Sequence, residues 1–236
     1  MKSGTLYLIP NVIADDTQKS VISPQVLEAL NTITHFLAED IRTARRFLSS
    51  LKIYESIESL HFEVLNKDTK ETELESLMKP LSEGKNLGVI SESGCPGVAD
   101  PGALAVEYAH KKKIKVVPLV GPSSILLALM ASGLNGQQFA FHGYLPIDSK
   151  EGATKIKQLE SESRQKNQTQ IFIETPYRNN QVLKSLTDNL NPNSRLCIAF
   201  NLTGKDEFIK TQTVSAWKKQ IPTLSKEPAV FLFLAQ

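Results

Sequence analysis

Short apolar runs alternate with helix-like segments over the first half of the chain, and this alternation limits the possible folds more than any other feature. The apolar runs cover residues 5–9, 86–90 and 114–120, and helical patterns such as 70–84 and 103–113 separate them. Strands separated by helices of this length form βαβ units around a parallel sheet. The sequence therefore predicts an α/β fold for the first half.

The second half also contains strand-like and helix-like segments, in a less regular order. The strand-like segments cover 138–146, 168–174, 195–201 and 229–235, and the helix-like segments cover 151–166, 179–190 and 214–221. We place a domain boundary near Val120 to Gly121, where one α/β unit ends and the next begins. The prediction is an N-terminal α/β domain over 1–120 and a C-terminal α/β domain over 121–236.

The composition indicates an ordinary globular protein of a reducing compartment. The net charge of +2 is too small to require a nucleic-acid partner, although a local basic face is compatible with it. Cys95 and Cys197 lie far apart and have no metal-ligand spacing, which favours a cytoplasmic location. No run of 18 apolar residues occurs, so we expect no membrane span and no metal site.

A loop rich in glycine and proline follows the apolar run 86–90. Its sequence from Ser91 to Gly102 is SESGCPGVADPG, and eight of the twelve glycines lie between Gly84 and Gly136. Glycine lets a backbone approach a ligand closely, because it has no Cβ. The chain has neither G-x-G-x-x-G after its first apolar run nor a P-loop motif. We therefore expect a small-molecule site of another kind at the ends of the strands 86–90 and 114–120.

Four segments carry a family resemblance: SESGCPGVADPG, VVPLVGPSSILLALMASGL, FAFHGYLP and IFIETPYR. In order and spacing they resemble the ribosomal small-subunit methyltransferase I family of 16S rRNA (cytidine-2′-O)-methyltransferases, within the tetrapyrrole methylase superfamily. The resemblance extends to GTLYLI and AEDIRTARRFL and covers nearly the whole chain. It implies two α/β domains of the class III methyltransferase type, S-adenosylmethionine in the cleft between them, 16S rRNA as substrate and a homodimer.

The resemblance also implies a set of cofactor-binding residues. They are Ile13 after the first strand, Gly94, Cys95 and Val98 in the first glycine-rich loop, Ser123 and Ser124 in the second, and Glu174 and Leu202 in the C-terminal domain. Hydroxyls and backbone N–H groups suit the amino-acid end of the cofactor, and apolar walls suit its adenine. The alternative for each loop is a tight turn without a ligand.

The chain departs from the family pattern at several positions. The family usually has a loop of the type Pro-Ile-Gly-Asn-Leu after the first strand. Residues 9–20 of this chain read IPNVIADDTQKS and do not keep the glycine and asparagine at those positions, and Asp15 and Asp16 add negative charge. Glu92 and Cys95 replace the usual aspartate and threonine. These departures bear on the identity of the substrate more than on that of the cofactor, because added negative charge repels an RNA phosphate.

The segment AEDIRTARRFL is the expected substrate-facing helix. Arg42, Arg45 and Arg46 share one helix face that could hold phosphate, and the alternative is a solvated surface balanced by Glu39 and Asp40. With the resemblance, we predict functional roles for Glu39, Asp40 and Arg42, and catalytic ones for Glu39 and Arg42.

A ribose hydroxyl needs a base, and Glu39 and His61 are the candidates. His35 and His142 are expected to be packed structural residues.

Three functions remain open from the sequence. The first is an rRNA ribose methyltransferase, the second a methyltransferase for a small molecule such as a tetrapyrrole, and the third a binding module without catalysis. RNA affinity that depends steeply on salt would favour the first.

Overall fold

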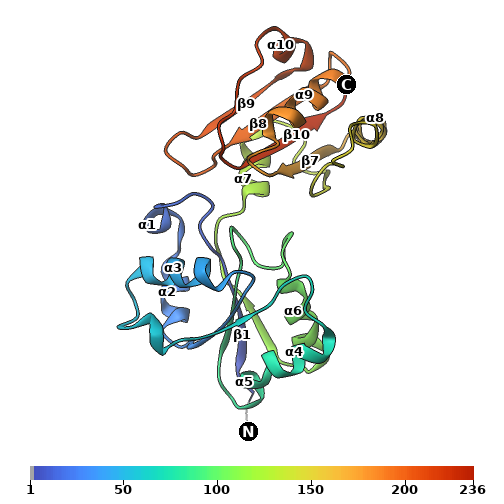
Figure 1. Cartoon of the computed structure of the whole chain (residues 1–236). Coiled ribbons are helices and arrows are strands. Elements are labelled where there is room, and N and C mark those ends of the chain that lie inside the picture. The colour runs from blue at the N-terminus through green and yellow to red at the C-terminus, as the bar shows by residue number, and fades with distance from the viewer. Residues whose placement is uncertain (1–2) are drawn as a thin grey trace. The chain divides into compact units, whose positions relative to one another are not determined.

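The computed structural model describes residues 3–236 and divides into two compact units, Met1–Ser123 and Ser124–Gln236 (Figure 1). Each unit has its own sheet of five strands. The division falls after Ser123, whereas the sequence placed it at Val120 to Gly121. The prediction of an α/β protein with two sheets is confirmed.

The first unit is a parallel α/β sheet with the strand order β3-β2-β4-β1-β5. Its strands are β1 (Thr5–Ile9), β2 (His35–Ala38), β3 (His61–Val64), β4 (Leu87–Ile90) and β5 (Lys115–Pro118). Its helices are α1 (Gln18–Val21), α2 (Pro24–Leu30), α3 (Ile41–Leu51), α4 (Glu71–Leu77), α5 (Lys79–Ser82) and α6 (Gly102–Lys111), with a 3₁₀ turn at Ile57–Ser59. All the paired strands run the same way, as βαβ connections require.

Helices cover both faces of this sheet (Figure 1). Ile9, Phe36 and Ala38 pack with α2 and α3 on one face. Leu6, Leu37 and Val89 pack with α4, α5 and α6 on the other. Neighbouring residues of one strand point to opposite faces, so a sheet covered on both sides needs continuous apolar strands. The buried run of β4 has this character.

Two predictions for the first unit need correction. The helix expected over 70–84 is two short helices, α4 and α5, because Pro80 has no N–H to continue the α4 ladder. The strand β3 was not expected, since its residues HFEV are mostly exposed at the sheet edge and carry no apolar run.

The second unit contains a mixed sheet with the strand order β6-β7-β10-β8-β9. Its strands are β6 (Phe139–Phe141), β7 (Thr169–Glu174), β8 (Arg195–Phe200), β9 (Phe208–Thr213) and β10 (Ala229–Leu234). Its helices are α7 (Ser124–Ser132), α8 (Ser149–Lys166), α9 (Asn179–Asn189) and α10 (Val214–Lys219). Only β6 and β7 pair in parallel, and β10 runs antiparallel to both of its neighbours. The strand β9 was not expected, because polar residues interrupt its sequence FIKTQT.

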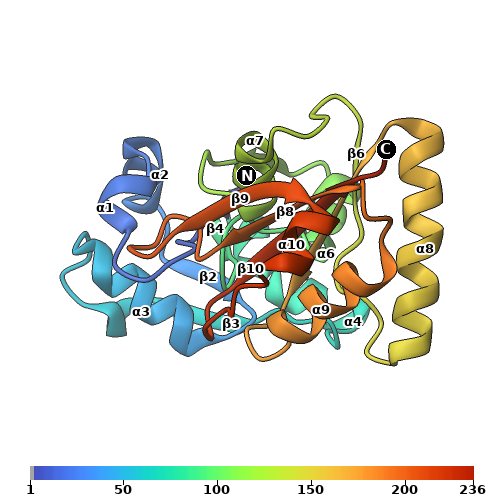
Figure 2. The same cartoon turned by 90° about the horizontal axis from the view of Figure 1, so that it is seen from above.

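One large apolar core holds the second unit together. Phe172, Phe231 and Phe233 pack in it with apolar residues of α8, α9 and α10. Figure 2 shows these three helices near the strands of the second sheet. Trp217 of α10 is buried there, and its indole Nε1 donates a hydrogen bond to the carbonyl of Leu196 over 2.9 Å. The helix α7 lies outside this core and contacts β8, β9 and β10.

His142 and His35, which were expected to be packed structural residues, are both half-buried and both have ring contacts. His142 is packed as expected, with Nε2 2.6 Å from Gln170 Oε1 and its ring stacked on Phe172. His35 is half-buried, and its ring centroid lies 4.5 Å from that of His61 on the neighbouring strand. Burial, with a smaller contribution from His61, lowers the pKa of His35. His35 therefore packs against the exposed His61 of the outermost strand, β3.

Within residues 3–236, no helix is both long and apolar enough to span a membrane.

Candidate functional site

The parallel strands of the first unit bring four loops to one edge of the sheet. The segments after β1, β2, β4 and β5 all leave from the carboxyl ends of adjacent strands. Ligands of open α/β sheets bind at this edge, outside the carboxyl ends of the strands. Most of the residues predicted from the sequence for the first unit lie there.

The glycine-rich loop after β4 has a backbone that few residues other than glycine tolerate. Gly94 has φ +70° and Gly97 has φ +79°, both in the left-handed region. Asp100 Oδ1 accepts hydrogen bonds from the N–H groups of Gly97, over 3.0 Å, and Gly102, over 2.7 Å. The side chain of Val98 is left 50% exposed. The loop is therefore fixed internally and presents an apolar side chain.

Asn11 connects this loop to the end of β1. Its side chain is 2% exposed, and Nδ2 donates to the carbonyls of Ser91, over 3.0 Å, and Glu92, over 3.2 Å. Its backbone N–H donates to the carbonyl of Gly94 over 2.8 Å. Because a buried carbonyl without a donor is costly, Asn11 stabilises one conformation of the turn 91–94. This role was not predicted from the sequence, although an asparagine two residues after the strand β1 was an available signal.

The second loop, after β5, packs closely against the first. The thiol of Cys95 donates to the carbonyl of Pro122 over 3.3 Å, and burial raises the pKa of this thiol. A Cβ added to Gly121 would lie 2.2 Å from Pro10 Cβ, so only glycine fits there. Ser123 ends the first unit and Ser124 begins α7. Cys95 thus has the environment of a packed thiol rather than of a nucleophile.

Three carboxylates lie at the same edge. Glu39 and Asp40 follow β2, and Glu92 follows β4. Burial, with repulsion from Glu39, Asp40 and Asp100, raises the pKa of Glu92. Asp40 has a structural task, because it caps α3 by accepting a hydrogen bond from the N–H of Thr43, which lowers the pKa of Asp40.

The three arginines of α3 have different surroundings. Arg42 is exposed in the first turn of the helix, next to Glu39 and Asp40 in the sequence. The guanidinium of Arg45 lies 5.2 Å from the ring centroid of Phe62. Arg46 lines a surface hollow of about 250 Å³ to which Ile13, Asp15, Asp16 and Glu92 also contribute. The expected common phosphate-binding face is therefore divided between an aromatic contact and an acidic hollow.

The structure does not bring His61 to this edge. His61 begins β3 and pairs in register with His35 at the start of β2, whereas Glu39 follows the end of β2. At roughly 3.3 Å per residue, four residues of strand separate the two levels by about 13 Å. The three residues predicted to be catalytic are therefore not one group: Glu39 and Arg42 share the carboxyl edge, and His61 lies at the amino edge.

The second unit also has an edge at which predicted residues meet. Ala229 pairs with Glu174 on one side and with Phe200 on the other, so β7 and β8 end at the same level. Leu202 lies two residues beyond β8 and is 3% exposed. The structure thus brings Glu174 and Leu202 to one edge of the second sheet.

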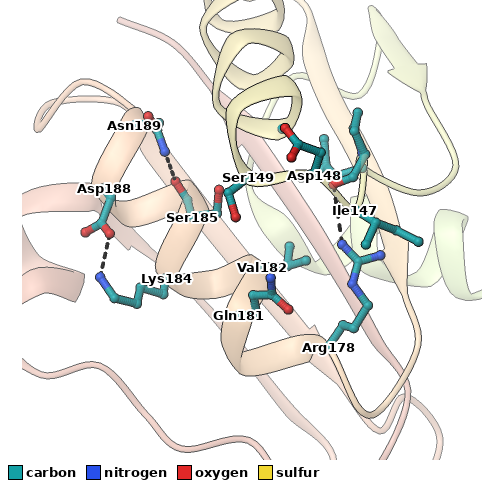
Figure 3. Close-up of a pocket in the computed structure, with 13 residues that line it drawn as sticks. Ile147, Asp148, Ser149, Arg178, Gln181, Val182, Lys184, Ser185, Asp188 and Asn189 are labelled. Atoms are coloured by element: carbon teal, nitrogen blue, oxygen red, sulfur yellow. Dashed lines mark hydrogen bonds and ion pairs between the residues drawn. The ribbon is translucent and has the colours of Figure 1, made fainter.

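The carboxylate of Glu174 is already occupied by neighbours. Its Oε1 accepts from the N–H of Thr175 over 2.7 Å, and its Oε2 lies 3.2 Å from Arg178 Nη1 as an ion pair without a well-aligned hydrogen bond. Arg178 Nη2 also donates to the carbonyl of Pro146 over 3.4 Å, so it joins the loops after β6 and β7 (Figure 3). Glu174 therefore positions loops in this structure.

Thr203 lies beside Leu202 after β8 and was not predicted as a site residue from the sequence. Its Oγ1 is buried without a hydrogen-bond partner, and its φ of +67° is unusual for a β-branched residue. Asn201, two residues earlier, also has a positive φ, of +48°. Strained backbone of this kind concentrates at ligand sites. The polar sequence NLTG after a buried strand was the available signal.

Among residues 3–236, no group of three or more His, Cys, Asp or Glu side chains could hold a metal ion.

Residues 19–217 match the protein family described as Tetrapyrrole (Corrin/Porphyrin) Methylases. The chain belongs to the tetrapyrrole methylase family. Members of this family use S-adenosylmethionine as methyl donor.

Curated relatives support the assignment to the tetrapyrrole methylase family. The protein named Ribosomal RNA small subunit methyltransferase I of Escherichia coli O157:H7 is 32% identical, over 92% of this chain and 73% of its own length. Proteins of the same name are 30% identical in Buchnera aphidicola subsp. Acyrthosiphon pisum, over 92% of this chain and 74% of theirs, and 31% identical in Bacillus subtilis, over 88% and 67%. The resemblance stated from the sequence is confirmed.

Two solved structures show the same fold as this member of the tetrapyrrole methylase family. The methyltransferase CobJ matches with a TM-score of 0.62 and 17% identity, over 100% of this chain and 95% of its own. Uroporphyrin-III-C-methyltransferase from Thermus thermophilus matches with a TM-score of 0.54 and 15% identity, over 99% and 93%.

Replacing Asn11 by alanine tests its role in fixing the loop 91–94. We expect the variant to lose about 1–3 kcal/mol of unfolding free energy, because two carbonyls lose their buried donor. Urea denaturation measures this loss. Asn193→Ala, in an exposed turn, is the control and should change little. An Asn11→Ala variant as stable as the wild type would contradict the role.

Proposed function

We propose that this protein is an S-adenosylmethionine-dependent methyltransferase that methylates a ribose 2′-hydroxyl of 16S rRNA. The observation that supports the proposal most directly is the similarity, over 92% of the chain, to relatives named small-subunit rRNA methyltransferases. The tetrapyrrole substrate considered from the sequence is supported by the description of the family and by likeness to two solved structures, but not by the names of the curated relatives above. The cytoplasmic location of the protein and its assembly as a homodimer stay predictions.

The residues present fit the proposed cofactor. In the first unit, the left-handed backbone at Gly94 and Gly97 gives the loop a tight fixed turn, and the half-exposed Val98 offers an apolar contact. In the second unit, Thr203 has a buried hydroxyl with no protein partner, beside the apolar Leu202. We assign Gly94, Cys95 and Val98 to the first set of cofactor contacts, and Leu202 and Thr203 to the second. Glu174 we assign to positioning its loop.

Methyl transfer from a sulfonium needs alignment more than covalent participation by the protein. The cofactor supplies an electrophilic methyl group when it is bound. The fixed loops after β1, β4 and β5 would orient the reactants, and orientation alone can contribute several kcal/mol to the barrier reduction. The ribose 2′-hydroxyl would lose its proton during this transfer, and a residue of this chain would have to accept it.

We assign the proton acceptor to Glu92. His61 lies at the opposite edge of the sheet, and Asp40 is engaged in capping α3. Glu92 is the second residue of the glycine-rich loop 91–102, and burial and neighbouring carboxylates raise its pKa. A carboxylate with a raised pKa is a better base near neutral pH than an ordinary one. Glu39 contributes to this shift and, in this proposal, acts through Glu92.

Blocking the glycine-rich loop should weaken cofactor binding. Val98→Trp adds bulk at an exposed position and should raise the Kd for S-adenosylmethionine about tenfold or more, measured by titration calorimetry. Val64→Trp is the matched control, because Val64 is also an exposed valine of the first unit, 41% exposed on β3. Equal affinities for the two variants would refute the cofactor assignment.

Removing the protein from its cell should remove one 2′-O-methyl mark from 16S rRNA. Mass spectrometry of the rRNA nucleosides measures the mark, and re-expression of the wild-type chain should restore it. Ribose methylation that stays complete in the deletion strain would reject the rRNA proposal. A small-molecule substrate would then be the leading function, provided that cofactor binding persists.

The rate of transfer should increase with pH through the raised pKa of Glu92, because only the carboxylate accepts a proton. Glu92→Gln should slow single-turnover methylation roughly a hundredfold and abolish this acid limb. Glu39→Gln should keep the limb and move it to lower pH, since one repulsive charge is lost. Glu63→Gln, on β3, serves as the control. An unchanged pH profile in Glu92→Gln would exclude Glu92 as the base.

A further inference from the structure

Acidic and basic residues are divided unequally between the two units. The first unit, residues 1–123, has 14 Lys and Arg and 16 Asp and Glu, a balance of −2. The second, residues 124–236, has 13 Lys and Arg and 9 Asp and Glu, a balance of +4. RNA affinity depends largely on neutralising phosphates. If the substrate is RNA, as proposed above, the second unit is the better place to hold it.

Tyr177 is the most exposed aromatic side chain at the edge of the second sheet where β7 and β8 end. It follows β7 and is 81% exposed. The ammonium of Lys226 lies 5.3 Å from the centroid of its ring. Lys226 precedes β10, which begins opposite the end of β7 because Ala229 pairs with Glu174.

Other cation–aromatic pairs of residues 3–236 lack this exposure. Arg45 lies over Phe62, Lys112 over Tyr108 and Lys210 over Trp217, and those rings are half-buried or buried. Their rings already pack against protein. Tyr177 is the ring in this set that is available for a ligand.

Buried polar contacts fix the backbone on both sides of Tyr177. Before Tyr177 in the chain, the N–H of Thr175 donates to the carboxylate of Glu174. After it, Arg178 forms an ion pair with the same carboxylate. Arg178 also donates to the Pro146 carbonyl, and Figure 3 shows the guanidinium beside Ile147. An aromatic side chain on a fixed backbone loses little entropy when a ligand stacks on it.

The segment that carries Lys226 is attached to the same helix. The fully buried side chain of Asn179 donates to the carbonyl of Glu227 over 2.7 Å. Asn180 Nδ2 donates to the Leu224 carbonyl over 2.8 Å, and its Oδ1 accepts from the Leu224 N–H over 2.9 Å. These three bonds hold residues 224–227 against the first turn of α9, next to Tyr177. The tyrosine and the lysine are therefore positioned together.

We propose that Tyr177 and Lys226 form a binding platform for an unpaired nucleotide of the RNA substrate. The base stacks on the exposed ring of Tyr177, and Lys226 neutralises a neighbouring phosphate. Stacking on aromatic side chains is the common way in which proteins hold single-stranded RNA, and a nearby cation adds the charge that RNA requires. The platform would hold the RNA strand without taking part in the chemistry.

RNA binding by single-residue variants of the whole chain tests the platform. With a fluorescein-labelled single-stranded RNA of mixed sequence, fluorescence anisotropy should show Tyr177→Ala binding about tenfold more weakly than wild type. Tyr177→Phe keeps the ring and should bind within about twofold. Lys226→Gln should weaken binding and reduce the salt dependence by about one phosphate contact. Lys112→Gln removes the same charge beside Tyr108 in the first unit and should leave RNA binding unchanged.

Several outcomes would overturn the platform. They are wild-type RNA affinity in Tyr177→Ala, an equal loss in Lys112→Gln, or a loss for duplex RNA as large as that for the single strand. Unchanged RNA affinity together with altered sedimentation of Tyr177→Ala would instead make this surface a contact between copies of the chain. A failure of the proposed function would be seen in a different experiment. In that case the deletion strain would keep all its rRNA ribose marks, independently of the RNA affinity of the Tyr177 variants.

Discussion

The parallel register of the first sheet is the constraint on which the candidate site depends. Because β2, β4, β1 and β5 run the same way, their following loops leave from one edge. The glycine-rich loop, the loop that contains Pro122 and the carboxylates of residues 39 and 92 meet there for this reason. The same register excludes His61, which starts a strand where those residues end one. Had β3 run antiparallel to β2, its first residue His61 would have lain at the edge where Glu39 follows β2.

Polar side chains with little exposure fix the loops at both edges. In the first unit, Asn11 holds the turn 91–94 and Asp100 holds two N–H groups of the glycine-rich loop. In the second, Arg178 joins two loops and Asn179 fixes the segment before β10. Each of these groups is costly to bury unless it is hydrogen-bonded, so each favours one loop conformation. A site that must align a sulfonium, a methyl group and a hydroxyl benefits from such preorganisation.

The charges of the two units suit different parts of the proposed reaction. The acidic edge of the first unit would repel phosphate but raises the pKa of Glu92, which helps a carboxylate to accept a proton. The second unit has a positive balance and an exposed tyrosine beside a lysine, which suit a nucleic-acid strand. Of the three α3 arginines predicted to hold phosphate, Arg45 lies over the ring of Phe62 and Arg46 lines the acidic hollow, while Arg42 is exposed.

The sequence by itself determined the fold class, the family and most strands and helices, because continuous apolar runs, helical spacing and glycine-rich loops are local properties. It could not determine β3 or β9, whose polar edge sequences become strands only through pairing with a neighbour. It predicted Glu174 as a cofactor-binding residue, but the ion pair of its carboxylate with Arg178, just before α9, is visible only in the structure. It offered His61 and Glu39 as alternative bases, and only the strand register showed that they lie at opposite ends of the strands, about 13 Å apart along the strand direction. Side-chain chemistry is written in the sequence, whereas the meeting of side chains depends on which strand ends lie at the same edge.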